Sequence, residues 1–327
     1  MIKFIQFTLA IFSCILFSAN VWAQAQTNEQ SLDRIIAVVN NQVIVESELN
    51  KAMNKIKSQL TASHTPLPQT DVLRKQVLEQ IINKKLQLEV ADQAGIDVTE
   101  DQLEKAISNI AKSNHMTVTQ LYSEIAKRGI DKEEYRKDIY DEYTIHQIQQ
   151  KAIASRITVS QEEVDDFMRS AAWQAHNNKE YHLEDILIAL PEVPSSQDMM
   201  DAKKRAEGIV AKLHQGTPFR EAAAAESNDS KALQGGDLGW RKLPEIPSAF
   251  ATQILLAKDN DILGPIQTPN GFHVIHIAGI RNVEVPVKTD QHRQIQQLIF
   301  ERKYEEALQS WITKIRGEAF INTHPEG

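Results

Sequence analysis

The stretch that decides the fold of the second half of the chain runs Tyr181-His182-Leu183-Glu184-Asp185-Ile186-Leu187-Ile188. Its apolar and β-branched residues continue to Leu190, and Pro191 and Pro194 follow, which predicts a strand that ends in a loop. Apolar residues then recur at helical spacing from Met199 to Leu213, and Gly216 follows. This pattern predicts a helix directly after the strand.

Two more helices and a pair of strands are expected beyond this helix. Thr217-Pro218 opens a short helix, since proline is favoured at the first helical position, and another helix is expected near Phe250 to Ala257. Two β-rich runs, 262–267 and 272–280, flank the turn sequence Thr268-Pro269-Asn270-Gly271. A strand, helices and an antiparallel strand pair within about a hundred residues indicate a compact α+β domain.

The N-terminal half has a different pattern. Residues 35–45 place two β-branched runs on either side of Asn40-Asn41, which predicts a β-hairpin. Apolar residues at helical spacing follow from Val45 to Leu60 and from Leu73 to Ile82. Three further helix starts carry Thr or Ser followed three residues later by Gln or Glu: Thr99 with Gln102, Thr117 with Gln120, and Ser160 with Glu163. Residues 24–176 are therefore expected to form a mostly helical domain with a hairpin near its start.

The C-terminal segment is predicted to be one long helix. Apolar and charged residues alternate from Ile295 to Ile315. Because an isolated amphipathic helix is marginal in water, it must bury its apolar face against another part of the chain. The helical N-terminal domain offers a matching surface. We therefore predict an α+β protein with a discontinuous, mostly helical core, 24–176 plus 283–327, into which the α+β domain 177–282 is inserted as a satellite.

The first 23 residues are typical of a secretory signal peptide. Met1-Ile2-Lys3 precedes an apolar run from Phe4 to Phe17, and Val21-Trp22-Ala23 suits cleavage after Ala23. The run is shorter than the ~20 apolar residues that a membrane span needs. Cys14 lies inside the run, which disfavours a lipid anchor. The mature chain is thus expected in the periplasm or outside the cell, without a stable membrane anchor.

Composition excludes several kinds of chemistry. Cys14 is the only cysteine, so a mature chain would have no disulfide, thiol nucleophile or cysteine-bound zinc. The net charge of -8, with both signs interspersed, disfavours nucleic acid and anionic lipid as partners. His273 and His276 lie three apart, so on a strand they face opposite sides. No metal, ATP or other cofactor is therefore expected.

Several stretches, in this order, resemble the SurA family of periplasmic chaperones. Those that resemble its N-terminal domain are Ala37 to Ser47 and Ala106 to Met116. Those that resemble a parvulin-type prolyl isomerase domain are Tyr181 to Ile188, Gln234 to Trp240, Gly264-Pro265-Ile266 and Gly271-Phe272-His273. The resemblance covers nearly all of the mature chain. SurA proteins commonly carry two parvulin domains, whereas here the terminal helix follows directly after Asn282, so one such domain is expected.

The resemblance also implies a site. Leu238, Ile246 and Phe250 would form the pocket for the prolyl ring, and His273, Asp229, Asn270 and Thr268 would form the polar surround. Parvulins usually carry a histidine at the strand position of Asp185. We therefore expect His273 to face Asp185, whose carboxylate would favour the charged imidazole and raise its pKa. His273, Asp229 and Asp185 are the candidate catalytic residues. Without the resemblance, the three apolar residues would be assigned to the core, and Gly235-Gly236 to a tight turn.

Three functions remain open from the sequence. The resemblance implies a chaperone that binds unfolded outer-membrane proteins and proline-containing polypeptides. A second hypothesis is an isomerase that acts chiefly on prolyl bonds. This reaction breaks no covalent bond, so it needs an apolar pocket and polar groups that stabilise the twisted amide, not a nucleophile. The third is a holdase or interaction module whose parvulin domain is catalytically degenerate, because Asp185 replaces the usual histidine.

Overall fold

The structure is a computed structural model that describes residues 33–62, 67–283 and 288–323. The predicted signal peptide, with Cys14, lies outside the described residues. None of the helices within the described part of the chain is both long and apolar enough to cross a membrane.

The chain begins with the predicted hairpin, which is confirmed. Strands β1 (Ile35–Val39) and β2 (Gln42–Val45) pair antiparallel, and Asn40 in the turn takes a positive φ of 50°. A short C-terminal strand, β7 (Ile321–Thr323), pairs antiparallel with the other edge of β1. The sheet order is therefore β2-β1-β7, and its third strand was not predicted. This pairing ties the two ends of the described chain together.

The helices of the first half follow the sequence pattern closely. They are α1 (Glu46–Ala62), α2 (Thr70–Gln93), α3 (Glu100–Ser113), α4 (Val118–Lys127), α5 (Lys132–Ala152), the short η1 (Ala154–Arg156), α6 (Gln161–Arg169) and α7 (Ala171–His176). Thr99 and Thr117 form complete capping boxes at the starts of α3 and α4. Ser160 accepts a hydrogen bond from the backbone N–H of Glu163 at the start of α6. All three predicted helix starts are confirmed.

The second half forms an antiparallel sheet of order β4-β3-β6-β5. Its elements are β3 (Lys179–Ala189), α8 (Ser196–His214), α9 (Phe219–Glu226), η2 (Ala232–Gln234), β4 (Asp237–Lys242), η3 (Leu243–Glu245), α10 (Ser248–Leu256), β5 (Ile262–Thr268) and β6 (Gly271–Asn282). Helix α9 begins at Phe219, so Pro218 occupies the N-cap position and not the predicted first helical position.

Strand β4 was not predicted, because the Gly235-Gly236 pair directly before it is typical of a turn. It pairs with β3, and directly before it the carbonyl of Gly236 accepts from the Asp185 N–H at 2.8 Å. A side chain at position 236 would place its Cβ 2.2 Å from the carbonyl oxygen of Asp185. Gly236 also has a positive φ of 74°. The glycine therefore permits the close approach that starts this strand.

The two faces of this sheet pack against different helices. On one face Ile186 and Val274 pack with residues of α8 and α9. On the other face Leu183 and Ile275 pack with Phe250 of α10. His273 contacts Phe250, whereas His276 stacks on Phe219 of α9. The prediction that the two histidines face opposite sides is thus confirmed, and only His273 lies on the α10 side.

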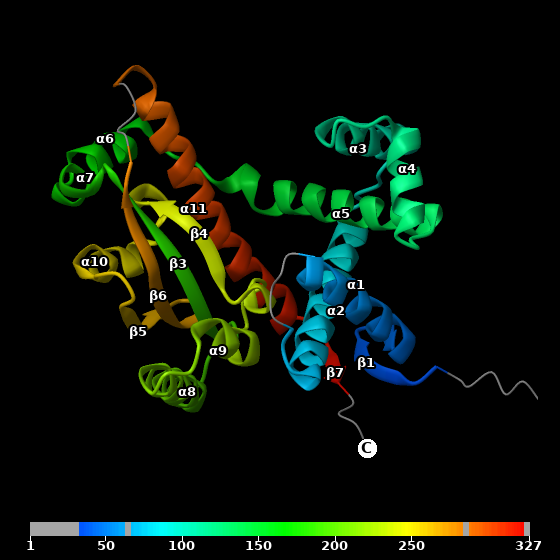
Figure 1. Cartoon of the computed structure of the whole chain (residues 1–327), viewed down its shortest axis with the longest axis horizontal. Coiled ribbons are helices and arrows are strands. Elements are labelled where there is room, and N and C mark those ends of the chain that lie inside the picture. Colours follow the sequence, from blue (N-terminus) through cyan, green and yellow to red (C-terminus); the bar gives the residue numbers. More distant parts are fainter. Residues whose placement is uncertain (1–32, 63–66, 284–287, 324–327) are drawn as a thin grey trace, which may run out of the picture. The chain divides into compact units, whose positions relative to one another are not determined.

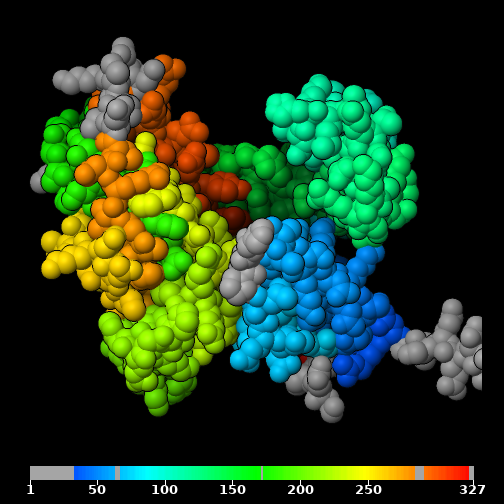
Figure 2. Space-filling view, in the orientation of Figure 1, coloured from blue at the N-terminus to red at the C-terminus, as the bar shows by residue number. Residues whose placement is uncertain are grey.

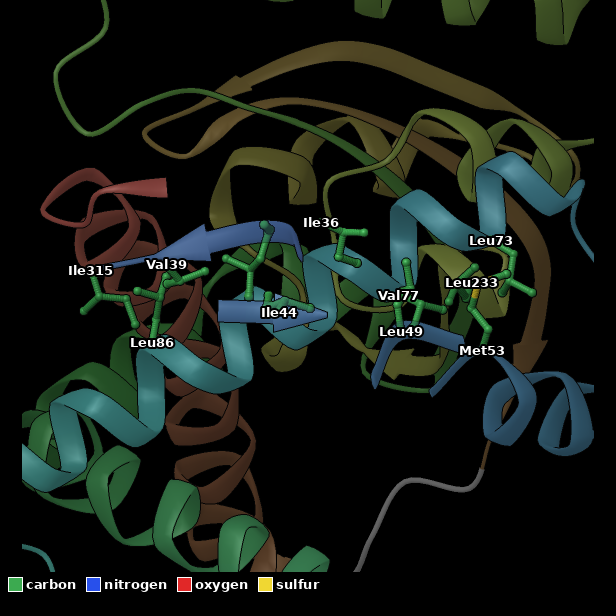
Figure 3. Packing of buried hydrophobic residues seen from close by; sticks show 12 residues of the cluster. Ile36, Val39, Ile44, Leu49, Met53, Leu73, Val77, Leu86, Leu233 and Ile315 are labelled. Carbon is green, nitrogen blue, oxygen red and sulfur yellow. The ribbon is translucent and has the colours of Figure 1, made fainter. Parts of the chain in front are cut away.

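The C-terminal helix α11 (Lys288–Gly317) packs on both halves of the chain (Figure 1). Near its start, Ile295 and Ile299 are buried with Val164 of α6 and Leu243 of η3. Near its end, Ile315 joins the cluster formed by the hairpin and α2 (Figure 3). The prediction that this helix must bury an apolar face is confirmed.

The α+β domain is packed directly on the N-terminal helices. Leu233 of η2 is buried with Leu73 and Val77 of α2 (Figure 3). The buried Gln76 of α2 donates from Nε2 to the carbonyl oxygens of Ala224 and Ser227, at 3.1 and 3.0 Å. The inserted domain is therefore attached to the helical domain by buried apolar packing and by hydrogen bonds.

We expect Leu233→Ala to destabilise the protein by about 2 to 4 kcal/mol, because it removes a buried side chain and leaves a cavity. Leu256→Ala is the matched control, since Leu256 is 82% exposed and Leu233 only 2%. Urea unfolding of both variants measures the difference. Equal midpoints for the two variants would contradict the packing described here.

Candidate functional site

A cavity of about 980 Å³ lies on the α10 side of the sheet. All eight residues predicted for the site line it: Asp185, Asp229, Leu238, Ile246, Phe250, Thr268, Asn270 and His273. Its second wall consists of His146 and Gln150 of α5 and residues 300–310 of α11, apart from Arg302. None of these residues was among those predicted for the site. The space-filling view shows the orange and red surface of α11 next to the yellow and orange surface of the sheet domain (Figure 2).

His273 and Asp185 form the expected pair. The distance from His273 Nδ1 to Asp185 Oδ2 is 2.8 Å. Residue 273 lies opposite Leu187 in the β3–β6 ladder, so Asp185 is its diagonal neighbour on the same face. The other ring nitrogen, Nε2, lies 3.2 Å from Thr268 Oγ1, and the Phe250 ring packs on the imidazole with centroids 4.8 Å apart. The imidazole is thus held by contacts at both nitrogens and by the tilted ring of Phe250.

The environment of His273 favours a charged ring. Burial disfavours the charge, but the Asp185 carboxylate, its hydrogen bond to Nδ1 and the charge of Asp229 outweigh burial and raise the pKa of His273 above its ordinary value. The side chains of His273 and Asp185 are only 12% and 8% exposed, so water screens their attraction weakly. The direction agrees with the sequence prediction.

Asp185 has one oxygen with no partner. Its Oδ1 atom is buried and makes no hydrogen bond within the described residues. Such an orphaned acceptor is costly, and buried polar atoms in native proteins are nearly always paired. Asp185 as a residue lines the cavity, but Oδ1 itself is buried and not exposed to it.

Asp229 and Asn270 are each held from α11. The Oδ1 atom of Asp229 accepts from the backbone N–H of Lys231 at 2.7 Å, and its Oδ2 accepts from Gln309 Nε2 at 2.9 Å. Ser310 Oγ donates to Asn270 Oδ1 at 2.9 Å. Burial raises the pKa of Asp229, and the neighbouring Asp185 adds to this, whereas the Lys231 N–H opposes it. Polar residues of an amphipathic helix are usually solvated, so no sequence signal marked Gln309 and Ser310.

The predicted apolar pocket residues have two roles in the structure. Ile246 is 1% exposed and Phe250 4%, and both belong to the cluster beneath the sheet together with the half-buried Leu238. The same three residues line the cavity. The core assignment and the pocket prediction are therefore compatible, since these side chains form the cavity floor.

The opposite face of the sheet carries a second histidine–carboxylate pair. His276 Nδ1 lies 2.8 Å from Glu184 Oε2, under the Phe219 ring of α9. This pair is not among the residues of the large cavity. Across the described ranges, no group of three or more His, Cys, Asp or Glu residues could hold a metal ion.

The fold and the cavity define a protein that joins a helical domain to a parvulin-type domain. Two family models match it in sequence: the SurA N-terminal domain over residues 32–149, and the PPIC-type PPIase domain over residues 185–279. The second match contains all eight predicted site residues, the first of which, Asp185, is also its first residue.

Two named relatives are similar to most of the chain. The chain is 39% identical over 267 residues to "Chaperone SurA" of Legionella pneumophila (strain Lens), covering 82% of this chain and 62% of that protein. It is 37% identical over 277 residues to "Chaperone SurA" of Saccharophagus degradans, covering 84% of this chain and 64% of that protein. The chain is therefore similar in sequence to these SurA chaperones, and it spans somewhat over three fifths of their length.

A solved structure described as two SurA-like chaperones of Campylobacter jejuni is also similar. Its TM-score is 0.45 at 12% sequence identity, and the match covers 90% of this chain and 100% of that one.

We expect the imidazole of His273 to titrate above its ordinary pKa, and Asp185→Asn to lower that pKa by removing the nearest negative charge. The raised pKa contributes stability that is fully present below the ordinary value of 6.5 and is lost as the pH rises through the raised value. Asp185→Asn should weaken this pH dependence. Imidazole NMR titration and urea unfolding across this range measure both effects. Glu184→Gln, on the opposite face, is the control, and an unchanged His273 titration in Asp185→Asn would refute the assignment.

Proposed function

We propose that this protein is a periplasmic chaperone that assists the folding and assembly of outer-membrane proteins, and that its parvulin domain isomerises prolyl bonds. The relatives named Chaperone SurA and the match to a PPIC-type PPIase domain support this proposal. The signal-like sequence of residues 1–23 supports export. The proposed division is 24–176 with 283–327 as the chaperone core and 177–282 as the isomerase domain.

The observation that carries the isomerase proposal is the His273–Asp185 pair above an apolar floor. Rotation about an X-Pro bond faces a barrier of about 18 to 20 kcal/mol and breaks no bond. Ile246 and Phe250 would remove water from the prolyl ring, which favours the less polar, twisted amide over the planar one. The catalyst therefore has only to bind the twisted form better than the planar form.

The polar surround would fix the peptide about the rotating bond. A charged imidazole donates from both nitrogens, so His273 can hold Asp185 and Thr268 in place at once. The Asp185 carboxylate would keep this imidazole charged and oriented beside the bound peptide. In this proposal Asp185 is a working replacement for the usual histidine.

The chaperone proposal rests on the size of the same cavity and its two walls. Its volume of about 980 Å³ is at the upper end of ordinary ligand sites and much larger than a prolyl ring needs. One wall comes from the parvulin domain and the other from α5 and α11. A cavity of this kind would accommodate a stretch of extended, unfolded polypeptide, and release would follow from weak binding.

We expect the purified protein to accelerate cis-trans isomerisation of a short Ala-Pro peptide, and Phe250→Ala to lower kcat/KM at least about tenfold, because the floor of the cavity loses its largest apolar side chain. A protease-coupled or NMR exchange assay measures the rate. Phe219→Ala is the matched control, since Phe219 is also buried but lies on the other face of the sheet. A wild-type rate equal to the uncatalysed one would leave only a degenerate parvulin domain.

The protein is also expected to suppress aggregation of a denatured β-barrel client, followed by light scattering. If the cavity binds the client, Phe250→Ala should weaken protection together with isomerisation, while Phe219→Ala should leave both largely intact. Protection that survives in Phe250→Ala would assign client binding to the helical core instead. Aggregation unaffected by wild-type protein would contradict the chaperone role.

A further inference from the structure

We propose that Gln309 of α11 is a positioning residue of the isomerase site, because its side-chain amide holds Asp229 in the cavity wall from outside the parvulin domain. This inference rests on the proposed isomerase function. It makes the site composite: the helical core supplies one of the contacts that the site requires.

The contact is direct and its geometry is good. Gln309 Nε2 donates to Asp229 Oδ2 at 2.9 Å in a partly buried position. The other carboxylate oxygen, Oδ1, accepts from the Lys231 N–H at 2.7 Å. Both oxygens of Asp229 are thus acceptors, one held by its own loop and the other by α11. Gln309 itself lines the cavity.

Helix α11 is anchored on both sides of Gln309. Towards its start, Ile299 is 1% exposed and packs on Leu243 of η3. Towards its end, Ile315 is buried in the cluster that contains Leu233 of η2. Between these anchors, Glu305 pairs with Arg241 of β4 at 3.1 Å. The helix therefore cannot shift locally at Gln309 without disturbing packing on either side of the cavity.

The chemistry of the contact gives Gln309 influence over charge in the site. Four groups face Asp229: Asp185 from β3, His273 from β6, Lys231 from its own loop and Gln309 from α11. Burial and Asp185 oppose the ionised carboxylate, while Lys231 and His273 favour it. The hydrogen bond from the Gln309 amide also favours it, because a donor stabilises the charged form of an acceptor. The charge on Asp229 in turn favours the charged form of His273. Gln309 thus acts on His273 through Asp229.

On α11, the acidic residues nearest in sequence are Glu305 and Glu306, and both line the cavity. Glu305 is paired with Arg241. Burial raises the pKa of Glu306, whereas Arg302 and Lys303 lower it. A variant at position 309 leaves these groups in place, so a change in the titration of Asp229 can be attributed to the side chain at 309.

Two opposite substitutions separate a positioning role from a packing role. Gln309→Leu removes the donor and should raise the pKa of the Asp229 carboxyl, whereas Gln309→Lys supplies a charged donor and should lower it. Loss of packing alone would not move this pKa in opposite directions. Carboxyl NMR titration of the full mature chain provides the measurement, and Gln297→Leu is the control, because Gln297 bonds only to Glu301 on its own helix among the described contacts.

Isomerase kinetics give the second readout. We expect Gln309→Leu to lower kcat/KM about tenfold and to shift its pH profile, since it removes a hydrogen bond to a charged group. Gln309→Lys should retain most of the activity. Identical Asp229 titrations in wild type, Gln309→Leu and Gln309→Lys would overturn the inference. If the titrations shift as expected while wild type shows no isomerisation, the isomerase function itself is refuted, and the two failures are thereby distinguished.

Discussion

The burial of the apolar face of α11 is the interaction on which the rest of the structure depends. The helix is amphipathic and would be marginal alone in water. It gains stability by burying Ile295 and Ile299 against α6 and η3, and Ile315 against the hairpin and α2. Burial of such side chains contributes about 1.5 to 3 kcal/mol each. Strand β7 then follows and closes the N-terminal sheet.

This packing also decides where the cavity lies. Once α11 is anchored at both ends, its middle section must run past the sheet face that carries His273. Some of the α11 side chains that enter neither cluster face the parvulin domain, and Gln309 and Ser310 bond to Asp229 and Asn270 there. The stability of the core and the completeness of the site therefore come from one helix.

Two histidine–carboxylate pairs, one on each face, show how the sheet accommodates buried carboxylates. Consecutive residues of β3, Glu184 and Asp185, point to opposite faces, and each meets a histidine of β6 at 2.8 Å. A buried carboxylate without a partner would be costly, whereas a carboxylate paired with imidazole is affordable in both places. The difference is that the Asp185 pair lines the large cavity, whereas the Glu184 pair does not. The same local chemistry is thus structural on one face and available to a ligand on the other.

The sequence predicts those features of the fold and the site that depend on residues close together in the chain. The hairpin at Asn40 and the capping boxes at Thr99 and Thr117 are decided by neighbouring residues, and all were predicted correctly. The resemblance to parvulins brought together eight residues that line one cavity, although their roles remain predictions. Strand β4 and strand β7 were missed, because their pairing depends on partners far along the chain. The contact of Gln309 with Asp229, 80 residues away, has no local signal at all.

The distribution of contacts around the cavity bears on how binding and catalysis would be linked. If a prolyl peptide enters as proposed, it meets a floor from the parvulin domain and a wall from α5 and α11. Any movement of α11 that widened the cavity for a bulkier client would lengthen the Gln309–Asp229 contact, and so weaken support for the charge on His273. Binding a large client would then require α11 to move away from Asp229, whereas isomerisation would require it to stay in place. A site assembled from two parts of the chain therefore couples the two proposed activities, whereas a site contained within the parvulin domain would leave them independent.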